Sequence, residues 1–100
     1  MKEEMVILFV EDDDGHARLI EKNLRRAGIR NEMLRFQDGQ EILDFLFHRG
    51  EGRKREDDTP YLLLLDIRIP KIDGLEVLRR LRADEQNRFV PVVILTSSIT

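Results

Sequence analysis

The sequence predicts an α/β fold in which a parallel sheet is doubly wound, with helices on both faces. Three apolar runs, Met5–Val10, Tyr61–Leu65 and Pro91–Leu95, carry no charged side chain. Uninterrupted apolar runs of this length are typical of strands that are buried on both faces of a parallel sheet. Segments of helical length separate the runs, and this alternation favours parallel strands joined by right-handed crossovers.

The segments between the apolar runs carry signals for three helices and one further strand. Apolar residues recur at helical spacing over Gly15–Ala27, and Gly28 marks the end of this first helix. A weaker strand is expected over Asn31–Phe36, near an edge of the sheet. Asp38 and Asp73 are each followed three residues later by a glutamate, a capping spacing that predicts a helix after each of them.

The second and third helices each have an apolar face that predicts core residues, and the second is expected to extend to about His48. The predicted core positions are Ile42, Phe45 and Leu46 in the second helix and Leu75, Leu78 and Leu81 in the third. The segment Gly50–Pro60 is charged and has no large apolar side chain. Its basic run, Arg53–Arg55, is flanked by acids, so we expect a solvated loop.

Composition and charge narrow the classes of function. The 100 residues are 41% hydrophobic and 37% charged, which predicts one small globular domain. The net charge of -3 argues against a nucleic-acid surface, and the lack of cysteine excludes a disulfide, a thiol nucleophile and a cysteine zinc site. No apolar run is long enough to span a membrane, and the expected location is cytoplasmic.

Polar side chains follow each of the three apolar runs. Glu11 and Asp12 come directly after the first run. Asp66 follows the second run, and Thr96 follows the third. Because the carboxyl ends of parallel strands meet at one edge of a sheet, we expect these side chains to converge there.

Converging carboxylates predict a divalent cation. They repel one another and stay ionised with a counter-cation, for which a hard ion with oxygen ligands is the natural choice. We expect Asp12 and Asp66 to bind Mg²⁺ directly, with the main-chain carbonyl of Arg68 as a further ligand. Glu11 would hold a ligand or a water behind them. A metal-held carboxylate is also a nucleophile toward a phosphoryl group, to which the Thr96 hydroxyl would donate a hydrogen bond.

Each acidic residue also has a simpler interpretation. Asp66 can be a solvated acid at the end of a strand, and Glu11 and Asp12 can cap the first helix, where acids are favoured. Asp73 is interpreted as a cap, and His16 as a solvent-facing residue of the first helical turn. The three strand ends taken together favour the metal and phosphoryl chemistry.

Three features occur together in an order and spacing that resembles one known family. They are the acidic pair, the segment Asp66–Gly74 with Pro70 within it, and the strand that ends at Thr96. Over essentially its whole length the chain resembles the receiver domains of two-component response regulators. The acidic pair and the charged loop resemble the stand-alone, CheY-like subgroup that is paired with phytochrome-like sensor kinases. The resemblance implies a flavodoxin-like fold with strand order 2-1-3-4-5.

The resemblance implies a phosphoacceptor signalling switch. Asp66 would accept a phosphoryl group from a sensor histidine kinase. Asp12 would bind Mg²⁺ with the help of Glu11, and Thr96 would be the switch hydroxyl. Output would pass through contact with a downstream protein, without direct binding of nucleic acid or membrane.

The sequence also departs from the receiver pattern. Receivers carry a lysine and a switch aromatic on a fifth strand, and the sequence ends at Thr100 before either. We therefore expect residues 1–100 to be one receiver domain that is incomplete at its carboxyl end, without the fourth helix, fifth strand and fifth helix. The uncovered edge Pro91–Leu95 would then favour a dimer or a swapped assembly.

Two other functions compete with the phosphoacceptor switch. An aspartate-nucleophile phosphatase of the haloacid dehalogenase type also uses a strand-end aspartate, but it needs a second aspartate where this chain has Arg68. A degenerate receiver would serve only as a protein-interaction module. Because the acidic cluster is intact, we expect a phosphoacceptor and not a degenerate receiver, and Arg68 argues against the enzyme.

Overall fold

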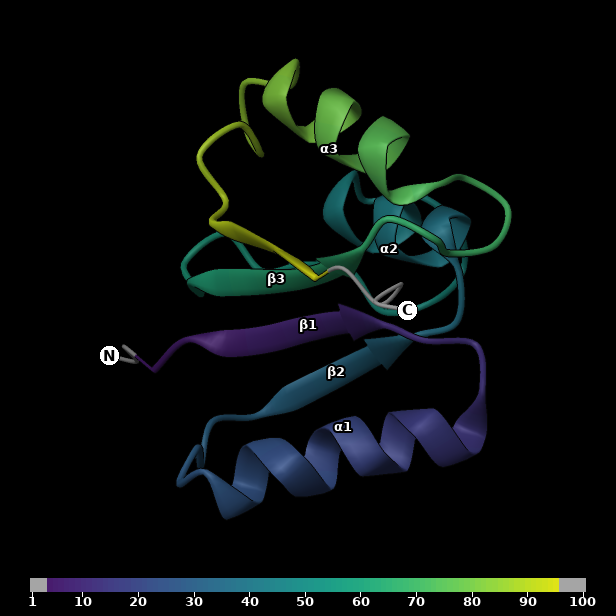
Figure 1. Cartoon of the computed structure of the whole chain (residues 1–100). Helices are drawn as coiled ribbons and strands as arrows, with labels where there is room; N and C mark the ends of the chain where they lie inside the picture. Colours follow the sequence, from purple (N-terminus) through teal and green to yellow (C-terminus); the bar gives the residue numbers. More distant parts are fainter. Residues whose placement is uncertain (1–3, 96–100) are drawn as a thin grey trace.

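Four parallel strands form the sheet, in the order β2-β1-β3-β4 (Figure 1). The structure is a computed structural model that describes residues 4–95. Its elements are β1 (Val6–Val10), α1 (Asp14–Arg26), β2 (Met33–Phe36), α2 (Gly39–Leu46), β3 (Tyr61–Asp66), α3 (Gly74–Arg82) and β4 (Val92–Leu95). The predicted doubly wound, flavodoxin-like fold is confirmed for these four strands.

Helices cover both faces of the sheet, and Figure 1 shows α1 on one side with α2 and α3 on the other. Side chains alternate between the faces along β1. Val6, Leu8 and Val10 join the main core with apolar residues of α2, β3 and α3, whereas Ile7 and Phe9 are buried on the opposite face. Burial on both faces places β1 inside the sheet. Glu11 and Asp12, which follow β1 directly, therefore start from a fixed strand end.

The second and third apolar runs are not buried on both faces, and that prediction is wrong. In β3, Leu62 and Leu64 are only half-buried. In β4, Val93, Ile94 and Leu95 are 44%, 38% and 40% exposed. Within residues 4–95, β4 is an edge strand, and α1 alone packs on the face that Leu62 and Leu64 share.

The helix boundaries agree with the sequence at most ends. Asp13 caps α1, and Gly28 adopts a left-handed φ of 97° just beyond its end, as a terminating glycine does. α2 ends at Leu46, earlier than the predicted His48. No helix within residues 4–95 has the length and apolar character needed to cross a bilayer.

The buried face of α3 differs from the predicted one. Val77 and Leu81, four residues apart, are fully buried and form the inward face, with Leu78 half-buried beside them. Leu75 is 57% exposed, so its prediction as a core residue is wrong. Two residues before Val77, it lies on the opposite side of the helix.

The charged loop between α2 and β3 is not wholly solvated. Arg55 lies over the ring of Tyr61, with its guanidinium carbon 5.4 Å from the ring centroid, and donates a hydrogen bond to the Asn87 side chain. Asn87 is completely buried and donates in turn to the Leu46 carbonyl at 3.0 Å. These contacts tie the loop to the connector before β4, so the prediction of a fully solvated loop is wrong at Arg55.

Candidate functional site

The structure brings the predicted acidic residues to one edge of the sheet. β1 and β3 are adjacent parallel strands in which Phe9 pairs with Leu64. Glu11 and Asp66 each lie two residues beyond that pair, so they and Asp12 leave the same edge at neighbouring positions. Asp66 pairs with Leu95 of β4 on its other side. Thr96 follows Leu95 in the sequence but lies outside the described residues.

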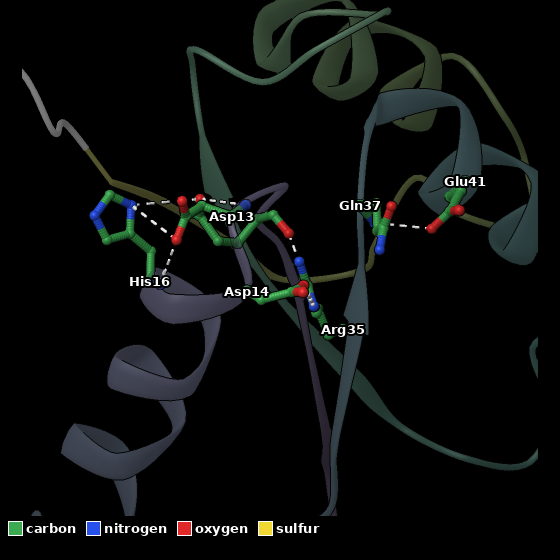
Figure 2. Close-up of polar contacts among 7 residues, drawn as sticks. Asp13, Asp14, His16, Arg35, Gln37 and Glu41 are labelled. Carbon is green, nitrogen blue, oxygen red and sulfur yellow. Dashed lines mark hydrogen bonds and ion pairs between the residues drawn. The ribbon is translucent and has the colours of Figure 1, made fainter.

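Most of the acidic loop between β1 and α1 is engaged in local hydrogen bonds (Figure 2). An oxygen of Glu11 accepts a hydrogen bond from the Asp13 amide at 3.1 Å and lies 3.7 Å from Nδ1 of His16. Asp13 accepts from the His16 amide at 2.8 Å, and this bond lowers the pKa of Asp13 below its ordinary value. Asp14 forms an ion pair with Arg35 at 2.8 Å. The carboxylates of Glu11, Asp13 and Asp14 therefore all have partners.

Asp12 differs from its neighbours because its side chain is exposed and has no hydrogen-bond or ion-pair partner within residues 4–95. Asp66 is half-buried, and its Oδ1 accepts a hydrogen bond from the Arg68 amide at 2.9 Å. No partner within that range contacts its Oδ2. Two carboxylates from adjacent strands thus each offer an uncommitted oxygen at the same edge.

The two carboxylates are ligands of the kind that a hard divalent cation prefers. Within residues 4–95, no three His, Asp or Glu side chains are gathered as a ready-made metal cluster. Mg²⁺ in phosphoryl-transfer sites commonly takes one or two carboxylates and completes its shell with water, phosphate or carbonyl oxygens. Asp12 and Asp66 are the two carboxylates at this edge that could serve in this way, and the Arg68 carbonyl follows the amide that holds Asp66.

The loop after Asp66 is closed by the Asp73-Gly74 pair. Asp73 accepts from the Glu76 amide at 2.9 Å and is the cap of α3, as predicted. The Gly74 amide donates to the Ile67 carbonyl at 2.9 Å. A Cβ at Gly74 would lie 2.4 Å from the carbonyl oxygen of Asp66, so only glycine allows this approach. The start of α3 therefore rests directly on the backbone of Asp66.

One contributor to the acidic loop was missed by the sequence analysis. Arg35 of β2 donates to the Glu11 carbonyl at 2.8 Å as well as to Asp14. A lone arginine in a weak strand carries no local pattern that reveals such a contact. His16, predicted to face solvent, is 71% exposed but also lies beside Glu11.

The response regulator receiver domain family matches residues 7–100 of this sequence. The chain belongs to that family. This match confirms the family that the sequence predicts. Receiver domains are phosphoacceptor modules of two-component signalling, and they bind a divalent metal.

Curated relatives cover most of this chain. The probable methanogenesis regulatory protein FilR2 of Methanothrix harundinacea is 43% identical over 94 residues, 93% of this chain and 58% of the relative. The response regulator Rcp1 of Synechocystis is 38% identical over 93 residues, 93% of this chain and 62% of the relative. The chain thus spans about three fifths of the length of these two relatives.

Solved structures of similar proteins share the fold. The bacteriophytochrome response regulator RtBRR has a TM-score of 0.82 at 44% identity, covering 94% of this chain and 57% of its own. The phosphorylated cyanobacterial phytochrome response regulator RcpA has a TM-score of 0.78 at 35% identity, covering 98% and 69%. The Mn²⁺-bound form of Rcp1 has a TM-score of 0.76 at 35% identity, covering 97% and 68%.

Proposed function

We propose that Asp66 is the phosphoacceptor of this receiver domain and that phosphorylation requires Mg²⁺ bound by Asp12 and Asp66. The main-chain carbonyl of Arg68 would be a further metal ligand. Glu11 would not bind the metal directly but would hold one of its ligands or a water. The observation that carries the proposal is the placement of two carboxylates at the ends of adjacent strands, each with an uncommitted oxygen. The metal-bound and phosphorylated forms of two similar proteins, Rcp1 and RcpA, support it.

The bond from the Arg68 amide gives the two oxygens of Asp66 different roles. Oδ1 accepts the amide hydrogen bond at 2.9 Å and has a second lone pair for the metal, which leaves Oδ2 free to attack phosphorus. In this step an oxygen–phosphorus bond forms while the phosphorus–nitrogen bond of a phosphohistidine breaks, and the departing imidazole takes up a proton. Bound Mg²⁺ would offset the charge of the carboxylates and the phosphoryl oxygens. Thr96 remains our prediction for the hydroxyl that contacts the acyl phosphate.

We propose that the domain acts as a switch and not as an enzyme on other substrates. Arg68 has an exposed side chain without a carboxyl group, so it does not supply the aspartate that a haloacid dehalogenase-type phosphatase needs at that position. The uncommitted carboxylate of Asp12 argues against a degenerate receiver. A sensor histidine kinase is the proposed donor, and the likeness to RtBRR supports the phytochrome-associated subgroup. A downstream protein partner and a cytoplasmic location stay predictions.

The intact mass of the protein tests this proposal. We expect incubation with Mg²⁺ and a small phosphodonor to add one phosphoryl group, and chelation of Mg²⁺ to prevent the gain. Asp66→Asn should take up none and stay folded by circular dichroism. Asp73→Asn is the matched control, because asparagine still caps α3 and should leave uptake intact. Uptake by a folded Asp66→Asn protein would overturn the assignment.

A further inference from the structure

Arg35 links β2 to both ends of the acidic loop (Figure 2). Its Nε donates to the Glu11 carbonyl at 2.8 Å, and its Nη1 donates to Oδ1 of Asp14 at 2.8 Å. A planar guanidinium presents several donors in a fixed fork, so a single arginine can hold two acceptors at once. The separation between the carbonyl of Glu11 and the carboxylate of Asp14 is therefore set by Arg35.

The contact to Glu11 bears directly on Asp12. The Glu11 carbonyl belongs to the peptide unit that leads into Asp12, and peptide units are planar, so holding that carbonyl orients the backbone from which the Asp12 side chain departs. The Glu11 amide donates to the Phe36 carbonyl at 2.8 Å. Both peptide units that flank Glu11 are thus fixed by consecutive residues of β2.

The contact to Asp14 limits which carboxylates are available for a cation. Asp14 is paired with Arg35 and Asp13 caps α1, whereas Asp12 has no side-chain partner within residues 4–95. Arg35 therefore keeps a competing carboxylate occupied and leaves Asp12 free. In a flexible loop of adjacent acids, no single carboxylate would be kept free for the cation.

The placement of Arg35 carries a cost. Its side chain is only 25% exposed, and its Nη2 is buried with no hydrogen-bond partner among the described residues. An unsatisfied buried donor lowers the stability of the folded state. An apolar residue on β2 would avoid this loss of stability. The contacts of Arg35 with the Glu11 carbonyl and the Asp14 carboxylate are what an apolar residue could not replace.

We propose that Arg35 is a positioning residue for the divalent cation. It orients Asp12 through the Glu11 carbonyl and withdraws Asp14 from the site. The inference rests on the proposed function, since it presumes that Asp12 is a metal ligand. The expected change in cation affinity on removal of Arg35 is opposite to the change that simple electrostatics predicts. Removing a positive charge beside a cation site should tighten cation binding through reduced repulsion, whereas losing a positioning contact should weaken it.

Calorimetric titration of the full chain with Mg²⁺ tests this inference. Arg35→Met is expected to weaken Mg²⁺ binding about tenfold, the lower end of the effect of losing a residue that orients a ligand. Arg35→Lys keeps the charge but replaces the fork with one ammonium, and should weaken binding less than Arg35→Met does. Arg53→Met is the matched control: it removes the same charge from an arginine paired with Glu32 at 3.5 Å, and should leave the affinity unchanged.

The outcomes separate this inference from the proposed function. If Asp12→Asn abolishes binding while Arg35→Met and Arg35→Lys bind Mg²⁺ as tightly as the natural chain or more tightly, the role of Arg35 is overturned and the site stands. If the natural chain and Asp12→Asn bind Mg²⁺ equally, the metal site is wrong and the inference falls with it. Should Arg35→Met fail to fold by circular dichroism, Arg35→Lys decides alone, and an unchanged affinity overturns the proposal.

Discussion

The size of residue 74 bears directly on Asp66, the proposed phosphoacceptor. Gly74→Ala would place a methyl group 2.4 Å from the carbonyl oxygen of Asp66 and 2.8 Å from Cα of Ile67. We expect a loss of about 1–3 kcal/mol in the free energy of unfolding, typical of overpacking against backbone. We also expect slower phosphoryl uptake, because the backbone of Asp66 must move. Urea denaturation and intact mass measure the two effects.

Gly52→Ala is the control for that change, because a Cβ at Gly52 meets nothing within 4 Å. It should leave both stability and phosphoryl uptake unchanged. A Gly74→Ala protein as stable and as readily phosphorylated as the natural chain would show that α3 does not rest on Asp66 as described.

Single residues were predictable where their role follows from a strand end. Asp12 and Asp66 follow apolar runs closely, so chain order alone predicts that they lie at the same edge of the sheet. Arg35 was not predictable, because its contacts reach from β2 to a loop more than twenty residues away. Arg55 was missed for a related reason: the buried Asn87 that accepts its hydrogen bond lies on a distant connector. Local patterns do not encode such tertiary partners.

At the scale of an element, α3 carries a measurable pH dependence. Hydrogen bonds from Arg79 and then Arg80 lower the pKa of Glu76 from 4.5 to about 2. The folded chain therefore holds the Glu76 carboxylate ionised over a range in which the unfolded chain binds a proton. This stabilisation is complete above about pH 4.5 and is lost as the pH falls toward 2.

Thermal unfolding of Glu76→Gln against pH checks that expectation. The natural chain should melt at a higher temperature than the variant at neutral pH, and the difference should shrink as the pH falls below 4.5. A difference that stays constant, or that grows on acidification, would contradict the ion-pair account of α3. Because the Glu76 side chain is partly exposed, at 31%, and screened by solvent, a modest difference is expected.

Elements were predictable where capping and periodicity agree. Asp38 and Asp73 both accept hydrogen bonds from amides three residues on, as their spacing predicts. The apolar face predicted for α3 is wrong at Leu75, which is exposed, and it omits Val77, which is buried. In a helix of nine residues several apolar stripes fit the sequence, and packing against α2 and β3 selects one of them.

At the scale of the molecule, β4 presents an apolar edge. Val93, Ile94 and Leu95 are all more than a third exposed, and within residues 4–95 no strand pairs with the outer edge of β4. An unpaired apolar edge is a template for another chain. We therefore predict that the 100-residue chain studied alone self-associates through the edge Pro91–Leu95, as a dimer or a swapped assembly.

Sedimentation velocity over a range of protein concentrations measures this association. The mean mass should rise with concentration for the natural chain, and Val93→Lys should reduce the rise, since a charge on an edge strand opposes pairing. A chain that stays monomeric and melts cooperatively at every concentration would refute the prediction.

The global arrangement was predicted well because alternating strand and helix leaves few topologies for a parallel sheet. The degree of burial was not, because an apolar run does not reveal how many of its faces are covered. β1 is buried on both faces, whereas β3 is fully buried on one face only and most of β4 is exposed, although their sequences are similar. The number of covered faces depends on which helices and strands pack beside a strand, and the strand's own sequence does not reveal this.

The central claim is that one carboxylate, that of Asp66, receives the phosphoryl group. Trapping the phosphorylated chain with borohydride, which reduces an acyl phosphate to an alcohol, marks the modified side chain for peptide mass spectrometry. Our account predicts that homoserine appears at position 66 alone, and only when Mg²⁺ is present. Homoserine at position 12 or 73, or at position 66 without Mg²⁺, would contradict it.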